Sequence, residues 1–117
     1  MISDLKPSDL VVKRCVACNA GTRAIPEDAV RNVVANLAGW EVTAIGTPEI
    51  AKTYRFKNFH ETMAFVNAVA WISHKEDHHP DMEVGYNRCR VRYSTHAIGA
   101  ISENDLICAA KVESLML

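Results

Sequence analysis

The sequence lacks long apolar segments and lacks a strong charge of either sign. No apolar run approaches the roughly 20 residues that a membrane-spanning helix needs, so no contact with a membrane is expected. Lysine and arginine total 13 and aspartate and glutamate total 14, which gives a net charge of −1. A nearly neutral chain lacks the basic surface that is typical of nucleic-acid-binding proteins. These absences favour a protein that acts on a small molecule.

The sequence lacks a complete metal site, although it contains four cysteines. Cys15 and Cys18 make a C-x-x-C pair, but Cys89 and Cys108 are too far apart in the sequence to supply a second pair. A thioredoxin-like role of the first pair would require a βαβ context, which its neighbours do not supply. We interpret Cys89 and Cys108 as small buried residues and the first pair as reduced thiols, and we predict no metal.

The length and the N-terminal sequence indicate one domain with an extension. A chain of 117 residues is long enough for one compact domain and too short for two ordinary ones. Residues 1–24 show no sustained periodicity, and we predict that they form an N-terminal extension to a domain over 25–117. The first residues lack the basic-then-apolar order of a secretion signal, so we expect a cytoplasmic location.

Three helices are predicted in the domain. Apolar residues at helical spacing follow Pro26 and two acidic residues, and this pattern predicts a helix that begins at the proline and ends before Gly39. Asn58 and Ser102 each begin a capping-box pattern that is followed by apolar residues. They predict two further helices, over 58–78 and 102–115.

Alternating residues predict two β-hairpins between these helices. The first covers residues 40–57 with a turn at Gly46-Thr47-Pro48, and the second covers 82–93. The order of elements is therefore α-β-β-α-β-β-α. Consecutive hairpins produce an antiparallel sheet, so the sequence predicts an α+β fold with a four-stranded antiparallel sheet and three helices on one face.

Histidines gather around the end of the second predicted helix. His78 and His79 directly precede Pro80, which cannot continue a helix and disfavours helical dihedrals at the residue before it. His96 follows the last predicted strand, and a hairpin that begins at Pro80 can return this strand to the helix end. Imidazole gives and takes protons near neutral pH. The pattern therefore indicates an enzyme that uses general acid–base catalysis.

The spacing of these residues resembles the signature of the pterin-4a-carbinolamine dehydratase family. The residues that carry the resemblance are Trp40 at the end of Leu-Ala-Gly-Trp, the segment Phe56-Lys57-Asn58-Phe59, the triplet His78-His79-Pro80, Tyr86, His96 and Asp105. The resemblance covers roughly residues 25–115. It implies removal of water from a 4a-hydroxytetrahydropterin to give the quinonoid dihydropterin, as part of tetrahydrobiopterin recycling. It implies no cofactor, because the pterin is the substrate.

The resemblance also implies roles for individual residues. His78 and His96 match the acid/base histidines of the family, and His79 matches the residue that helps to hold the substrate. Trp40 matches an aromatic residue of the pterin pocket. Asp105 completes the second capping box, so it is either a helix-start residue alone or, as the acid in the family signature implies, also a residue that orients His96.

Two further residues are candidates for substrate binding. His74 stands where many family members have a glutamate that contacts the pterin, which bears on the choice of pterin. Asp77 either pairs with a histidine or is a solvated residue of the last helical turn.

Other functions fit part of the same pattern. The wide apolar face of the 58–78 helix suits a non-catalytic assembly or transcriptional partner. A metal-dependent hydrolase would use the four histidines His74, His78, His79 and His96. The exposed edges of a single sheet favour a homodimer or homotetramer. Family membership also implies a link to an aromatic amino-acid hydroxylase.

Overall fold

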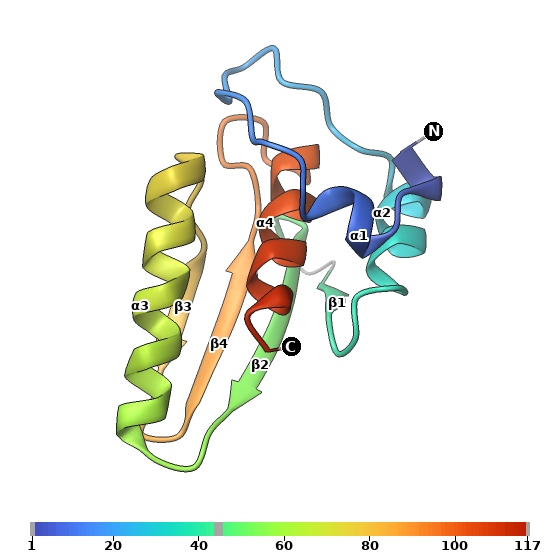
Figure 1. Ribbon diagram of the computed structural model, residues 1–117. Helices are drawn as coiled ribbons and strands as arrows, with labels where there is room; N and C mark the ends of the chain where they lie inside the picture. The colour runs from blue at the N-terminus through green and yellow to red at the C-terminus, as the bar shows by residue number, and fades with distance from the viewer. Residues whose placement is uncertain (1, 44–45, 117) are drawn as a thin grey trace.

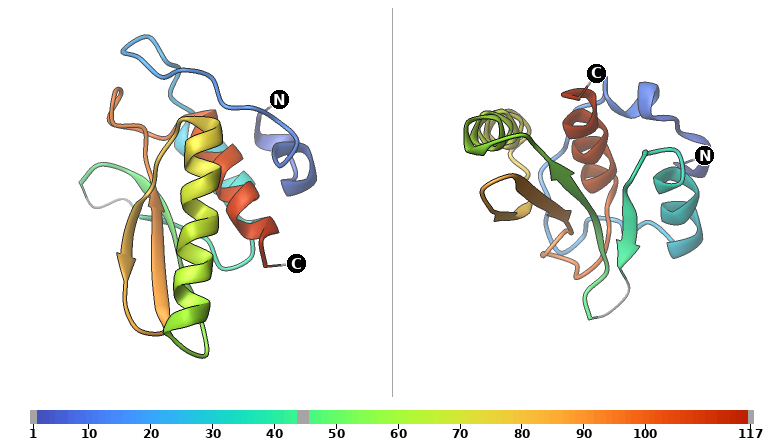
Figure 2. Two further views of the ribbon diagram at one scale, coloured as in Figure 1. Left: turned by 60° about the vertical axis from the view of Figure 1, so that its left-hand side comes forward. Right: turned by 90° about the horizontal axis from the view of Figure 1, so that it is seen from below.

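The computed structural model describes residues 2–43 and 46–116 and confirms the predicted α+β fold. The strands are β1 (Glu41–Thr43), β2 (Glu49–Arg55), β3 (Asp81–Val84) and β4 (Arg88–Tyr93), and the helices of the domain are α2 (Glu27–Val34), α3 (Phe59–Glu76) and α4 (Glu103–Ser114). All strand pairs are antiparallel, in the order β1-β2-β4-β3. The three helices lie on one side of the sheet (Figures 1 and 2). Residues 44 and 45, which belong to the first predicted hairpin, lie outside the described residues.

The core lies between the helices and one face of the sheet. Alternate strand residues such as Ile50, Val91 and Tyr93 are completely buried there, as the period of two in a strand requires. The opposite face carries the arginines of β4. Arg92 pairs there with Glu49 of the neighbouring strand β2, and Arg90 reaches across β2 to Glu41 of β1. No helix among the described residues is both long and apolar enough to cross a membrane.

The helix starts differ in detail from the predicted capping boxes. The Asn58 side chain accepts a hydrogen bond from the Glu61 N–H at 2.9 Å, but the Glu61 carboxylate accepts from Lys57 instead of returning to Asn58. At α4 the Asp105 carboxylate accepts from the Ser102 N–H at 2.9 Å, as predicted. Helix α2 begins one residue later than expected, with Pro26 as its N-cap.

The N-terminal residues pack against the domain. They form a short 3₁₀ turn, η1 (Ile2–Asp4), and one helical turn, α1 (Pro7–Leu10), and Leu10 is completely buried in the core. The chain then crosses α4 toward the C-terminal end of α3 (Figure 1). There the Cys15 N–H donates to the carboxylate of Glu76, a residue of α3 that is itself buried.

Trp40 lies in this core, where a polar cluster holds its indole. Its Nε1–H lies 3.2 Å from both the Tyr54 hydroxyl and Glu113 Oε1, and its ring stacks on Tyr93 with 6.3 Å between centroids. Glu113 Oε1 also accepts from the Tyr54 hydroxyl at 2.6 Å and from Lys52 Nζ at 2.8 Å. Burial, together with the neighbouring carboxylate, raises the pKa of Tyr54. Glu113 therefore connects α4 to β2 and to the residue before β1.

We expect Glu113→Gln to weaken the fold at neutral pH and to flatten its pH dependence. Burial raises the pKa of Glu113, but hydrogen bonds from Lys52 and Tyr54 outweigh it and hold the pKa below the ordinary value of 4.5. The stabilisation is therefore present above the ordinary value and is lost as the pH falls through the folded-state value. At pH 7 the variant should lose about 1 to 2 kcal/mol of unfolding free energy, and this difference should shrink in acid.

Urea denaturation of both proteins between about pH 3 and pH 7 measures this difference. Glu27→Gln is the matched control, because Glu27 is exposed and forms a surface ion pair with the exposed Arg31 at 2.9 Å. The control should reproduce the wild-type profile. If the unfolding free energy of Glu113→Gln falls as steeply in acid as that of the wild type, other carboxylates produce the pH dependence.

Candidate active site

The C-terminal end of α3 directs its histidines to different sides. Asp77 is the C-cap and adopts the left-handed conformation, with φ 51° and ψ 44°. Its N–H and that of His78 both donate to the Ser73 carbonyl, which closes the helix before Pro80. After this reversal His78 is buried, whereas His79 and Asp77 are exposed. The local backbone therefore separates two adjacent histidines into two environments.

His78 is held by a buried carboxylate. Its Nε2 lies 2.6 Å from Asp105 Oδ1, and Asp105 is completely buried at the start of α4. The ring of His78 is nearly parallel to that of Tyr93, with 5.9 Å between centroids. Asp105 thus caps the start of α4, as the first interpretation has it, and the histidine that it contacts is His78 and not His96.

The other oxygen of Asp105 is also occupied. Oδ2 accepts from the Thr95 hydroxyl at 2.7 Å and from the Ser102 N–H at 2.9 Å. The Ser102 hydroxyl lies 2.6 Å from Thr95 Oγ1, so it donates to that oxygen. A buried carboxylate needs such partners, because burial without them is costly. Sequence reasoning missed Thr95, although it directly precedes His96 in a Thr-His pair.

His74 and His79 line a hollow at the end of α3. Its volume is about 260 Å³, and its lining residues are Ala70, Ser73, His74, His79, Pro80 and Met82. The ring of His74 also lies beside Trp71, with 5.6 Å between centroids, and Trp71 is 61% exposed. Sequence reasoning missed this aromatic residue, which offers a flat surface next to the hollow. Trp40 offers little such surface, because it is 6% exposed.

His96 lies in the turn that follows β4. Its side chain is 76% exposed, and its Nε2 is 3.8 Å from Asp81 Oδ2 at the start of β3. An isolated bridge between Thr95 and Ala100 closes this turn. The turn, the end of α3 and the start of α4 lie at the same end of the molecule (Figure 1). His78, His79 and His96 therefore share one end of the fold, where His78 is buried and the other two are accessible.

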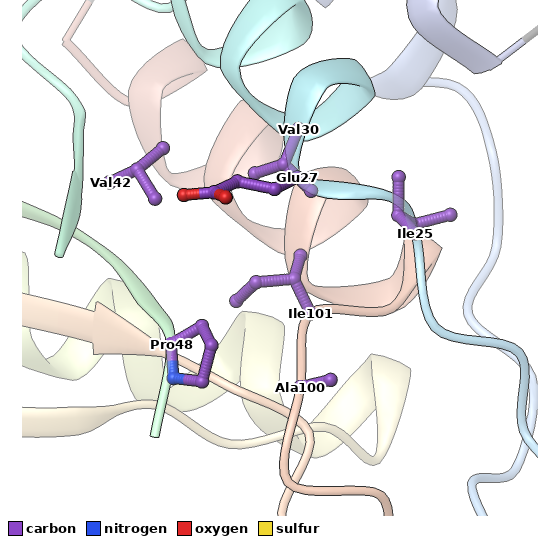
Figure 3. A pocket seen from close by; sticks show the side chains of 7 residues that line it. All are labelled: Ile25, Glu27, Val30, Val42, Pro48, Ala100 and Ile101. Atoms are coloured by element: carbon purple, nitrogen blue, oxygen red, sulfur yellow. The ribbon is translucent and has the colours of Figure 1, made fainter. Parts of the chain in front are cut away.

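A second hollow lies elsewhere and contains none of the predicted site residues. It has a volume of about 350 Å³, and it is lined by Ile25, Glu27, Val30, Val42, Pro48, Ala100 and Ile101 (Figure 3). Its lining is apolar except for the Glu27 carboxylate, which is already paired with Arg31. The ionisable group of this lining is therefore engaged in an ion pair, and the lining contains no histidine. The described residues also contain no cluster of three or more side chains that suits a metal ion.

Comparisons with known proteins agree on one family. The family model described as pterin 4 alpha carbinolamine dehydratase matches residues 23–115. A protein of Nitrosomonas eutropha with the provisional name pterin-4-alpha-carbinolamine dehydratase is 52% identical over 110 residues, which are 93% of this chain and 95% of that one. A protein of Legionella pneumophila with the same provisional name is 48% identical over 94% of this chain and 97% of its own.

Two solved structures are also similar. A transcriptional coactivator/pterin dehydratase from Brucella melitensis superimposes with a TM-score of 0.75 at 27% identity, over 80% of this chain and 98% of that one. A pterin dehydratase-like protein, identified as a RuBisCO assembly factor in the alpha-carboxysome, has a TM-score of 0.58 at 23% identity. This second match covers 66% of this chain and 88% of that one, and it supports the fold alone.

We expect Asp105→Ala to destabilise the protein strongly. The change removes the acceptor for the Thr95 hydroxyl, the Ser102 N–H and His78, and it leaves these buried groups without a partner. The expected loss of unfolding free energy is about 3 kcal/mol or more, measured by urea denaturation at pH 7. Asp81→Ala is the control, because it removes the exposed carboxylate beside His96, and it should leave the midpoint unchanged. Equal midpoints for all three proteins would contradict the structural role of Asp105.

Proposed function

Because the chain belongs to the pterin 4 alpha carbinolamine dehydratase family, we propose that it removes water from a 4a-hydroxytetrahydropterin and releases the quinonoid dihydropterin. In a cell this step would serve tetrahydrobiopterin recycling beside an aromatic amino-acid hydroxylase. The observation that carries the proposal is the buried His78–Asp105 pair at the end of α3, next to the hollow that His74 and His79 line. A buried pair of this kind holds the imidazole in one orientation and one tautomer.

The pairing with Asp105 divides the acid and base roles. A carboxylate that accepts from Nε2–H leaves the lone pair of His78 on Nδ1, so His78 is the proposed base that takes the N5 proton of the pterin. His96 is accessible, and its Nε2 lies 3.8 Å from Asp81 Oδ2, so His96 is the proposed acid that protonates the leaving C4a hydroxyl. The N5 electrons then form the C4a–N5 double bond as water departs. This elimination is complete without a metal or redox cofactor.

The remaining candidates would hold the substrate. His79 and His74 line the hollow and can donate or accept hydrogen bonds there, and Asp77 is exposed at the adjoining helix end. Trp71 is the exposed aromatic residue beside His74, and we propose that it supports the flat pterin ring. Trp40 stacks on Tyr93, and the other stacking partner of Tyr93 is His78. The proposed contribution of Trp40 is therefore to hold the Tyr93 ring in place beside His78.

We expect His78→Ala and His96→Ala each to reduce catalysis about 100-fold, which is the usual contribution of a positioned acid or base. The measurement is stopped-flow absorbance of 4a-hydroxytetrahydropterin decay in the presence of chelator. His60→Ala is the matched control, because His60 is an exposed histidine at the opposite end of α3. It should retain the wild-type rate.

Other outcomes of this assay distinguish the alternatives. Decay no faster with wild type than with buffer would contradict the enzyme and support a binding partner, a role that the name of the Brucella melitensis protein includes beside the dehydratase. Acceleration that occurs without chelator and is lost with it would show that the reaction requires a metal ion, as the metal-dependent alternative does. If the rate falls in His60→Ala as much as in His78→Ala, the assay gives no support for His78 and His96 as the base and the acid.

We also propose a homodimer or homotetramer that uses the exposed aromatic residues of α3 and the β3–β4 turn. Phe59 is 47% and Tyr86 is 67% exposed, and their rings stack with 6.4 Å between centroids. Analytical ultracentrifugation should give two or four times the mass of 13.0 kDa, and Phe59→Lys should shift the protein toward the monomer. Val12→Lys is the control, since Val12 is an apolar residue of the N-terminal extension that is 77% exposed. A wild-type monomer at all concentrations would contradict the proposal.

A further inference from the structure

We propose that Cys15 and Cys108 form a reversible, peroxide-sensitive disulfide that fastens the N-terminal extension to α4. Their sulfur atoms are 3.6 Å apart although the residues are separated by 93 positions in the sequence. All four cysteines are reduced in the structure. A disulfide bond is about 2.05 Å long, so the sulfurs need to approach by about 1.5 Å. The motif partner of Cys15 is Cys18, but the fold places the Cys15 sulfur against a different thiol.

The backbone around Cys15 is held so that its sulfur faces α4. The Cys15 N–H donates to Glu76 Oε1 at 2.9 Å, which ties it to the end of α3. The next residue, Val16, makes two hydrogen bonds with the side chain of Asn104: its N–H donates at 3.1 Å and its carbonyl accepts at 2.6 Å. Asn104 Nδ2 also donates to the Cys18 sulfur at 3.0 Å, so the Cys18 thiol has a different partner from the Cys15 thiol. The approach of Cys15 to Cys108 is therefore part of an ordered contact.

The two thiols differ in accessibility, and this difference sets the order of oxidation. Cys15 is half-buried, whereas Cys108 is completely buried. The hydrogen bond with Cys15, together with burial, raises the pKa of Cys108, so this thiol remains protonated. A dissolved oxidant such as hydrogen peroxide therefore meets Cys15 first. Cys108 then acts as the resolving thiol.

The reaction balances with hydrogen peroxide as the only oxidant. The Cys15 thiolate attacks one peroxide oxygen, the O–O bond breaks, hydroxide leaves, and Cys15 becomes a sulfenic acid. The Cys108 sulfur attacks the Cys15 sulfur, the S–O bond breaks, and the departing hydroxide takes the Cys108 proton as water. Two thiols and one peroxide thus give one disulfide and two waters. Each sulfur loses one electron, and a dithiol reductant reverses the change.

The link would act on the end of the fold that contains the candidate site. Cys108 follows Asp105 by one turn of α4, and Cys15 binds Glu76, which lies two residues before His78. Oxidation would therefore fix the extension across the start of α4 and the end of α3 at once. Reduction would leave the extension held by hydrogen bonds and by the buried Leu10. This inference does not depend on the proposed dehydration.

Mass spectrometry of the full-length protein tests the pairing directly. The protein is treated with hydrogen peroxide, its remaining thiols are blocked with N-ethylmaleimide, and it is digested with trypsin without reductant. Trypsin releases Cys15 and Cys18 on one peptide, 15–23, and Cys108 on another, 93–111. We expect these two peptides to be linked, and the link to disappear after dithiothreitol. A disulfide within peptide 15–23, or one between two copies of the chain, would overturn the proposal.

Single substitutions identify which cysteine of the pair is used. Cys18→Ser should retain the link to peptide 93–111, whereas Cys15→Ser should abolish it. Cys89→Ser is the control for a buried thiol, because burial raises the pKa of Cys89 and the residue lies in β4. It should also retain the link. Retention in Cys15→Ser and loss in Cys18→Ser would overturn the assignment to Cys15.

Thermal unfolding tests the disulfide without identification of the linked peptides. A cross-link that closes so long a loop constrains the unfolded chain, so peroxide should raise the melting temperature of wild type by roughly 5 °C or more, and dithiothreitol should reverse it. The same treatment should leave Cys15→Ser unchanged. An equal rise in Cys15→Ser would overturn the proposal, since it would come from another modification.

Discussion

The buried carboxylate of Asp105 is the group on which the arrangement of the histidines depends. Its two oxygens bind His78, Thr95 and the N–H of Ser102, which come from the end of α3, from the residues after β4 and from the start of α4. Each partner satisfies part of a charge that would be costly to bury alone. The contact therefore fixes three segments, and it sets the position from which His78 can act.

The backbone at the end of α3 is the second determinant of the site. The left-handed Asp77 closes the helix, and three residues later Pro80 begins the path into β3. Because the chain reverses between them, His78 turns inward to Asp105 while His79 turns outward to the hollow. Two adjacent, chemically identical side chains thereby acquire different partners and different access to solvent. General acid–base chemistry can use such a difference.

The N-terminal extension belongs to the same end of the molecule. It contributes Leu10 to the core, and it binds Glu76 through Cys15 and Asn104 through Val16. Burial raises the pKa of Glu76, but the Cys15 N–H, Lys111 and Arg14 outweigh it and lower the pKa, so the carboxylate stays charged beside the extension. The segment thus rests on both helices whose ends carry His78 and Asp105.

The sequence alone determined the secondary-structure elements, because apolar periodicity, capping residues and prolines influence the backbone within a few residues of their own position. It predicted the two hairpins, the three helices and the order that makes the sheet antiparallel, and the family resemblance selected the histidines and Asp105. It could not decide which histidine Asp105 would bind, that Trp40 would be buried, or that Cys15 would face Cys108 and not form a pair with Cys18. These contacts join residues between 27 and 93 positions apart. Only the packing of α3, α4 and the extension brings such distant residues within bonding range.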